Sequence, residues 1–220
     1  MIILAAGTSS RMKEYSPKCL KRIGDEEIIN RIIRQFYRGA DEIAVSVGFQ
    51  EDKIRNAVKY DVKYVRNNNF LNDKNIESCY RCLRSLKSEK SSGVLIIEGD
   101  VILTDHDASS IISRIEAYSE KSVVFAQSYC ESNKTRRGCI TEEGVCYLLE
   151  GINLGNTDNR MSGIFYVSSN YLDALKKDQI EMLSDAKENY YFSPVIASLT
   201  LPSSCSDRNV HIHSLHIICS

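Results

Sequence analysis

The sequence predicts one α/β domain over residues 1–220, a three-layer sandwich with helices on both faces of a mainly parallel sheet and a β-hairpin insertion. Three observations lead to this prediction. Short apolar, β-rich runs alternate with segments of helical periodicity, which is typical of a parallel sheet. The 220 residues suffice for one large core and are few for two. No internal repeat or Pro/Gly-rich linker divides the chain, and only three prolines occur.

The expected elements follow the chain in order. The predicted strands are Ile2–Leu4, Ile43–Val47, Lys63–Val65, Val94–Ile97, Val123–Ala126 and Gly163–Val167. The predicted helices are Glu27–Tyr37, Glu51–Val58, Lys74–Leu86, Ala108–Tyr118, Asn170–Lys177 and Asp185–Leu199. In the first helix, isoleucines recur at helical spacing and form an apolar stripe that we expect to pack on the sheet. Two short apolar runs, 138–141 and 145–148, flank Glu142-Glu143-Gly144 like the arms of an antiparallel hairpin.

Composition narrows the classes of function. A net charge of −1 gives no positive field for a polyanion, so we expect no nucleic-acid partner and favour a small anionic ligand. The apolar start, Met1–Ala6, is too short for a signal peptide or a membrane span, which predicts a cytoplasmic protein without a membrane partner. Eight scattered cysteines suggest reduced thiols, and Cys79 and Cys82 share one helical face and are expected to pack there. A homodimer stays open.

The first twenty residues carry the most specific pattern. The apolar run leads directly into Gly7-Thr8-Ser9-Ser10, a turn of small residues with a glycine and hydroxyl groups. Such a turn bends sharply and presents backbone N–H groups to an anion. Arg11 and Lys18 add two positive charges to this loop. Neither the P-loop pattern nor G-x-G-x-x-G is present here, which argues against ATPases and dehydrogenases.

The opening resembles the signature L-A-A-G-x-x-x-R-M…P-K-x-L of the MobA-like and sugar-phosphate nucleotidyltransferase superfamily. The pattern is closest to that of the CTP:phosphocholine or phosphonate cytidylyltransferases. The nine matching residues are Leu4, Ala5, Ala6, Gly7, Arg11, Met12, Pro17, Lys18 and Leu20. The resemblance implies a Rossmann-like fold and a reaction in which an NTP is joined to a phosphorylated acceptor while pyrophosphate leaves.

The resemblance also implies roles for the residues of this loop. The nucleotide would lie along Leu4, Ala5, Ala6, Gly7, Thr8, Ser9 and Ser10. Arg11 would hold the β- and γ-phosphates, and Lys18 would lie near the α-phosphate or the incoming phosphate as a compact charge. Both are therefore candidate catalytic residues. The alternative for any one of these residues is a glycine turn with solvated cations.

A second element is Glu98-Gly99-Asp100, which follows the apolar run Val94–Ile97. Mg²⁺ prefers hard oxygen ligands and takes one or two carboxylates plus substrate phosphates. By the resemblance, Asp100 is the metal ligand and a catalytic residue, with Mg²⁺ as the cofactor. Glu98 shares a face with Asp100 if the strand continues, which makes it a candidate partner. An acidic surface at a strand end is the alternative.

A third element is the polar start of the helix predicted at Lys74–Leu86, where Asn72 or Asp73 is the expected N-cap. In the resembled cytidylyltransferases a similar N-x-x-S precedes the corresponding helix. Asn75 and Ser78 match this pattern, which implies contact with the nucleobase or ribose of CTP. Helix capping alone is the alternative explanation.

The acceptor side is less defined. Ser162 and Gly163 lie on a run that resembles the strand closing the acceptor side of the site in this family. Glu188, Tyr190 and Tyr191 place aromatic rings beside a carboxylate, which suits a quaternary ammonium by cation–π attraction, although core packing is the alternative. The resemblance ends at the C-terminus, where no second metal-binding Asp appears.

The leading hypothesis is a Mg²⁺-dependent nucleotidyltransferase that moves CMP from CTP to a small phosphate or phosphonate of the phosphocholine or aminoethylphosphonate type. Two alternatives stay open. One is a sugar-1-phosphate nucleotidyltransferase that uses UTP, dTTP or GTP. The other is a nucleotide-binding module without catalysis.

Overall fold

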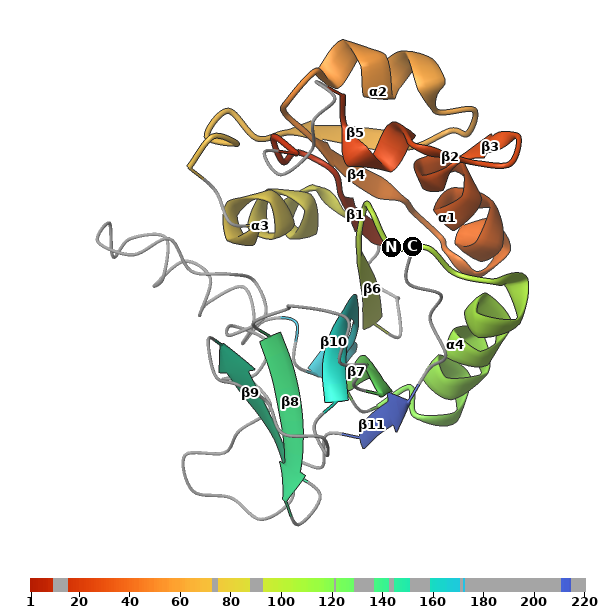
Figure 1. Cartoon of the computed structure of the whole chain (residues 1–220), viewed down its shortest axis with the longest axis vertical. Helices are drawn as coiled ribbons and strands as arrows, with labels where there is room; N and C mark the ends of the chain where they lie inside the picture. The colour runs from red at the N-terminus through yellow and green to blue at the C-terminus, as the bar shows by residue number, and fades with distance from the viewer. Residues whose placement is uncertain are drawn as a thin grey trace.

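The computed structural model describes residues 1–9, 16–72, 75–87, 93–120, 122–128, 137–142, 145–150, 159–170, 172 and 211–214 (Figure 1). Within these residues one nine-stranded sheet forms the centre of the molecule. Its strands are β1 Ile2–Leu4, β4 Ala44–Val47, β5 Lys63–Arg66, β6 Gly93–Glu98, β7 Val123–Ser128, β8 Arg137–Glu142, β9 Val145–Glu150, β10 Asn159–Ser168 and β11 His211–Ser214.

The sheet is mainly parallel, as predicted. The strand order is β11-β7-β10-β6-β1-β4-β5, and β8 and β9 lie off this path. The pairs β1–β4, β1–β6, β4–β5 and β11–β7 are parallel, whereas β10 runs antiparallel to both β6 and β7. The sequence does not reveal this reversed strand, because a buried strand reads as the same apolar run in either direction.

Helices cover both faces of the sheet, which confirms the Rossmann-like three-layer architecture. The helices are α1 Ile28–Phe36, α2 Glu51–Ala57, α3 Ile76–Ser85 and α4 Asp105–Ala117. Figure 1 shows α3 on one side of the sheet and α1 and α4 on the other. The apolar stripe of α1 is fully buried and joins a core cluster with Ile3 of β1, while α3 packs against β1, β4 and β5. Successive side chains of β1 point to opposite faces of the sheet and so pack beneath the helices on both sides.

The predicted hairpin is present. β8 and β9 pair antiparallel with Thr141 opposite Cys146, and β8 also pairs with β10. The expected packing role of Cys79 and Cys82 is confirmed as well, because both thiols are buried in α3. Among the described helices, none is both long and apolar enough to cross a lipid bilayer.

Several boundaries differ from the prediction. α4 begins at Asp105, one turn earlier than expected, because Thr104 and Asp107 form a capping box. The predicted N-cap of α3 at Asn72 or Asp73 is wrong: the N-cap position is Asn75, whose φ of 77° turns the chain into the helix. A small two-stranded sheet, β2 Arg22–Ile23 with β3 Glu26–Glu27, was not expected. Of the helix predicted at 170–177, only residues 170 and 172 are described, and that at 185–199 lies outside the described residues.

Candidate functional site

The strand order of the sheet reverses between β1 and β6. From β1 the chain adds β4 and β5 on one side, and then β6 on the other side. Leu4 and Glu98, the last residues of these two strands, are partners in the register. In open α/β sheets, ligands bind at the carboxyl ends of strands at such a reversal. The predicted nucleotide loop and the predicted metal carboxylate therefore meet at this edge.

Two glycines allow the strands to approach each other at this edge. The Gly99 N–H donates a hydrogen bond of 2.8 Å to the Leu4 carbonyl, and a Cβ on Gly99 would lie 2.8 Å from that same oxygen. A Cβ on Gly48 would lie 2.9 Å from the Ala6 carbonyl oxygen. A side chain at either position would force these backbones apart. The loop after β1 is therefore held closely between the ends of β6 and β4.

Hydrogen bonds fix the first part of this loop. The backbone N–H of Ala5 donates to Ser46 Oγ at 3.0 Å, and the Phe49 N–H donates to the Ala6 carbonyl at 3.0 Å. Leu4, Ala5 and Ala6 are all buried. Ser46, a buried serine on β4, was missed by sequence analysis, and its only signal is a lone hydroxyl within an apolar strand.

The loop then becomes accessible. Gly7 is exposed, and Thr8 and Ser9 are half-buried. Gly7 does not have a positive φ, and a Cβ there would meet no described atom within 4 Å. Neither the backbone conformation nor the packing of the described chain therefore requires a glycine at this position. The backbone of Gly7 is therefore open on the side where a side chain would stand.

Ser9 connects the loop to Lys18. Ser9 has a left-handed φ of 55°, and its Oγ accepts a hydrogen bond of 3.0 Å from the backbone N–H of Lys18. Lys18 begins the short 3₁₀ helix η1, Lys18–Leu20. Ser10 and Arg11, also predicted for this loop, lie outside the described residues.

Lys18 and Asp100 form an ion pair across 82 residues of sequence. Lys18 Nζ lies 3.1 Å from Asp100 Oδ2, and the two side chains are 35% and 40% exposed. A pair this exposed adds little to stability. Its two charges stay open to solvent at the carboxyl edge, where an anion and a cation can reach them.

Cys19 follows Lys18 directly but is buried, unlike the ion pair. Burial, and to a smaller extent the nearby charge of Asp100, raises the pKa of the Cys19 thiol to about 12. A thiol with this pKa stays protonated at neutral pH and is a poor nucleophile. Cys19 therefore supports the site by packing.

On the other side of β6, the bulge in β10 brings Gly163 against Glu98. The register of β10 with β7 shifts between Met161 and Ile164, and Gly163 takes a φ of 78° there. A Cβ on Gly163 would lie 3.1 Å from Glu98 Oε2. Ser162 donates its hydroxyl proton to the Phe125 carbonyl of β7. The predicted acceptor residues Ser162 and Gly163 thus lie next to the strand that precedes Asp100.

The residues predicted to read the base occupy the start of α3. Ser78 is 1% exposed, and its Oγ accepts a hydrogen bond of 3.0 Å from Asn67 Nδ2. Asn67 is itself fully buried at the end of β5, and its Oδ1 accepts from the Asn69 N–H at 2.9 Å. Asn75 occupies the N-cap position of α3 and makes no side-chain capping hydrogen bond among the described residues. Asn67 was missed by sequence analysis, since its partner becomes apparent only in three dimensions.

The donors at this edge suit a hard cation. Among the described residues, no cluster of three or more His, Cys, Asp or Glu side chains is arranged to hold a metal. The edge instead offers the carboxylates of Asp100 and Glu98, and Mg²⁺ needs only one or two carboxylates when substrate phosphates supply further oxygens. Glu188, Tyr190 and Tyr191, predicted for the acceptor, lie outside the described residues.

Known proteins resemble this chain in sequence. A family model described as "MobA-like NTP transferase domain" matches residues 1–152. The bifunctional protein GlmU of Campylobacter lari is 32% identical over 109 residues, which are 49% of this chain and 24% of that protein. The chain spans less than half of the length of the GlmU relatives that it matches.

Solved structures share the fold at low sequence identity. The CTP:phosphocholine cytidylyltransferase LicC of Streptococcus pneumoniae superposes with a TM-score of 0.67 at 17% identity, covering 98% of this chain and 89% of that chain. A UDP-glucose pyrophosphorylase complexed with UDP-glucose superposes with a TM-score of 0.62 at 17% identity, covering 80% of this chain and 78% of that chain.

Proposed function

Because the chain belongs to the family of MobA-like NTP transferase domains, we propose that it transfers a nucleoside monophosphate from an NTP to a small phosphate-bearing acceptor and releases pyrophosphate. The observation that carries this proposal is the exposed Lys18–Asp100 ion pair. It lies at the carboxyl edge of the sheet, where the strand order reverses, and Gly7 of the loop after β1 is exposed. This pair places an ammonium group that can bind phosphate beside a carboxylate that can bind a metal ion.

The proposed reaction is a displacement at phosphorus. An oxygen of the acceptor phosphate attacks the α-phosphorus of the NTP and forms a new P–O bond. The bond from the α-phosphorus to the oxygen that bridges the β-phosphorus breaks, and pyrophosphate leaves with the electron pair. Both reactants are anions, so catalysis depends on positioning and on neutralising charge.

The residues of the site would divide this work. The backbone N–H groups and hydroxyls of residues 7–9 are accessible to the triphosphate, and Lys18 would exchange its contact with Asp100 for a phosphate oxygen. Asp100 would hold Mg²⁺, with Glu98 as its neighbouring carboxylate. The ion, when bound, supplies positive charge against the triphosphate. The Ser9–Lys18 hydrogen bond keeps the lysine beside the loop.

For the substrates, we propose CTP and a phosphocholine or aminoethylphosphonate acceptor as the first candidate. The N-x-x-S pattern of Asn75 and Ser78 supports it, together with the shared fold with LicC. A sugar 1-phosphate with UTP, dTTP or GTP is the second candidate. The matches to GlmU and to UDP-glucose pyrophosphorylase support that candidate as much.

A matrix assay tests the proposal. Purified protein with Mg²⁺ is mixed with CTP, UTP, dTTP or GTP and with phosphocholine, aminoethylphosphonate or sugar 1-phosphates, and pyrophosphate release is measured. We expect release that depends on both substrates, with one donor and acceptor class preferred. If no pair releases pyrophosphate while calorimetry still detects NTP binding, the chain is a nucleotide-binding module and the proposal of catalysis fails.

A further inference from the structure

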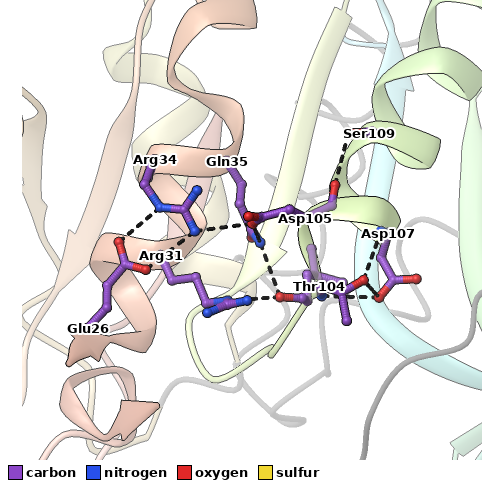
Figure 2. A network of polar contacts seen from close by, with 9 residues as sticks. Glu26, Arg31, Arg34, Gln35, Thr104, Asp105, Asp107 and Ser109 are labelled. Atoms are coloured by element: carbon purple, nitrogen blue, oxygen red, sulfur yellow. Dashed lines mark hydrogen bonds and ion pairs between the residues drawn. The ribbon is translucent and has the colours of Figure 1, made fainter. Parts of the chain in front are cut away.

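Helix α1 bears a row of polar side chains opposite its apolar stripe. Arg31, Arg34 and Gln35 have the spacing i, i+3 and i+4, which places them on one side of the helix. Figure 2 shows this row reaching toward the segment that joins β6 to α4, the segment that contains Asp100. These side chains therefore connect α1 to the segment that contains Asp100, the proposed metal ligand.

The row holds the backbone of that segment at Leu103. Arg31 Nε donates to the Leu103 carbonyl at 2.9 Å, and Gln35 Nε2 donates to the same oxygen at 3.1 Å. Leu103 lies three residues after Asp100, and its side chain is buried in the core. On the other side of Asp100, the Gly99 N–H is bound to Leu4. The backbone that carries Asp100 is thus fixed at both of its ends.

Arg34 makes a different kind of contact. Among the described residues, its guanidinium contacts two carboxylates, Glu26 at 3.1 Å and Asp105 at 3.1 Å. Gln35 Nε2 also donates to Asp105 at 2.8 Å. These hydrogen bonds, first that of Gln35 and then that of Arg34, lower the pKa of Asp105. Arg34 therefore touches the start of α4 and not the backbone next to Asp100.

Helix α1 also supports the lysine of the ion pair. Its first residue, Ile28, donates its N–H to the Lys21 carbonyl at 2.9 Å, directly after η1, which begins with Lys18. The helix is therefore a common base for Lys18 and Asp100. A shift of the Leu103 carbonyl relative to α1 would change the spacing of the two charges.

We propose that Arg31 is a positioning residue that sets Asp100 relative to Lys18 through its hydrogen bond to the Leu103 carbonyl. This inference rests on the proposed function. Groups that orient a metal-binding residue commonly change metal affinity or activity about tenfold or more when removed. Arg31 is expected to act through geometry, without contact to the substrates.

Three variants of the full chain separate positioning from stability. Arg31→Met keeps the length of the side chain and removes the donor, whereas Arg31→Lys keeps a charged donor. Arg34→Met is the matched control, since it removes an arginine from the same helix without removing a bond to Leu103. Each variant is measured for kcat and KM in pyrophosphate release, for Mn²⁺ affinity by electron paramagnetic resonance, and for amide exchange of residues 101–104.

We expect Arg31→Met to lower kcat and Mn²⁺ affinity about tenfold, with the KM for the NTP within about twofold, and to speed amide exchange in residues 101–104. Arg31→Lys should recover most of the kcat, and Arg34→Met should match the wild type. Equal Mn²⁺ affinity and kcat in Arg31→Met and the wild type would overturn the proposal, as would an equal loss in Arg34→Met.

The two proposals fail in different ways. A wild type that releases no pyrophosphate but binds Mn²⁺ contradicts the proposed function alone, and the Mn²⁺ affinity of Arg31→Met then decides the role of Arg31. A wild type that binds no Mn²⁺ overturns the positioning role as well, since Asp100 would hold no metal.

Discussion

Lys18 and Asp100 neutralise each other in the structure, and the proposed reaction needs their charges separately. Lys18→Ala and Asp100→Ala should each lower kcat about 100-fold or more, the size of loss typical when a group that stabilises transition-state charge is removed. Because the pair is exposed, the free energy of unfolding should change by less than about 1 kcal/mol.

The control for these variants is Lys21→Ala, which removes an exposed lysine from the same segment. Steady-state pyrophosphate release gives the rates, and urea denaturation gives the stabilities. Rates within twofold of the wild type in either site variant would contradict its assignment.

Gly7 gives a second prediction at the level of single residues. Gly7→Ala places a methyl group where no described atom lies within 4 Å, so stability should change by less than about 0.5 kcal/mol. NTP affinity, measured by calorimetry, should fall about tenfold if the nucleotide packs against this backbone.

Gly39→Ala is the matched control, because Gly39 is also exposed with open space around it and lies outside the loop. A Gly7→Ala variant that binds NTP like the wild type would show that the nucleotide does not lie on residue 7.

Sequence analysis predicted that Lys18, Asp100 and the loop from Leu4 to Ser9 form one site, because their residue types and spacing match a known signature. The structure brings these residues together, and their roles stay predictions. Sequence analysis missed Asn67 and Ser46, whose partners Ser78 and Ala5 lie on other elements. A buried hydrogen bond between distant elements leaves no periodic signal, so such residues become apparent only when the strand order is known.

Among the elements, α4 begins earlier than its apolar pattern predicts. Its first turn is stabilised by a capping box in which Asp107 N–H donates to Thr104 Oγ1 and Thr104 N–H donates to Asp107 Oδ2, each at 3.1 Å. The spacing T-x-x-D is visible in the sequence. The apolar pattern of the helix begins only at Ala108, which explains the late predicted start.

Thr104→Ala should therefore lower the free energy of unfolding by about 1 kcal/mol, the usual cost of losing an N-cap. Ser109→Ala, on the exposed side of the same helix, should change it by less than about 0.5 kcal/mol. Both values come from urea denaturation. An equal effect of the two substitutions would mean that the capping box contributes nothing to stability.

At the scale of the whole molecule, several carboxylates link stability to pH. The pKa values of Asp105, Glu27 and Glu42 are lowered, chiefly by hydrogen bonds from Gln35, from Asn30 and from the Lys87 backbone. A folded-state pKa below the unfolded value stabilises the fold above the unfolded pKa, and this stability is lost as the pH falls through the folded value.

We therefore expect the Tm to hold above about pH 5 and to fall below about pH 4, near the ordinary pKa of a carboxyl group. Differential scanning calorimetry across this range measures it. Asp105→Asn should make the fall of the Tm at low pH less steep, because the side chain at that position no longer titrates. A Tm that rises on acidification below pH 4 would contradict this linkage.

The layered architecture was predicted from the alternation of strands and helices, and the prediction holds for six strands, four helices and the hairpin among the described residues. The antiparallel direction of β10 and the position of β11 beside β7 were not predicted. Which distant strands pair depends on how the whole sheet packs against its helices. No single segment of the sequence contains that information. That the whole of 1–220 is one domain stays a prediction.

The place of β1 in the sheet has a consequence for synthesis. As the ribosome delivers the chain, β1 emerges before both of its neighbours: Ile2 pairs with Ala44 on one edge and with Ile96 on the other. Until β6 has been made, one backbone edge of the apolar strand β1 lacks its hydrogen-bonding partner and is open to association with other chains. The carboxyl edge between β1 and β6 therefore forms only after β6 has been made, and the loop after β1 is held on both sides from that moment.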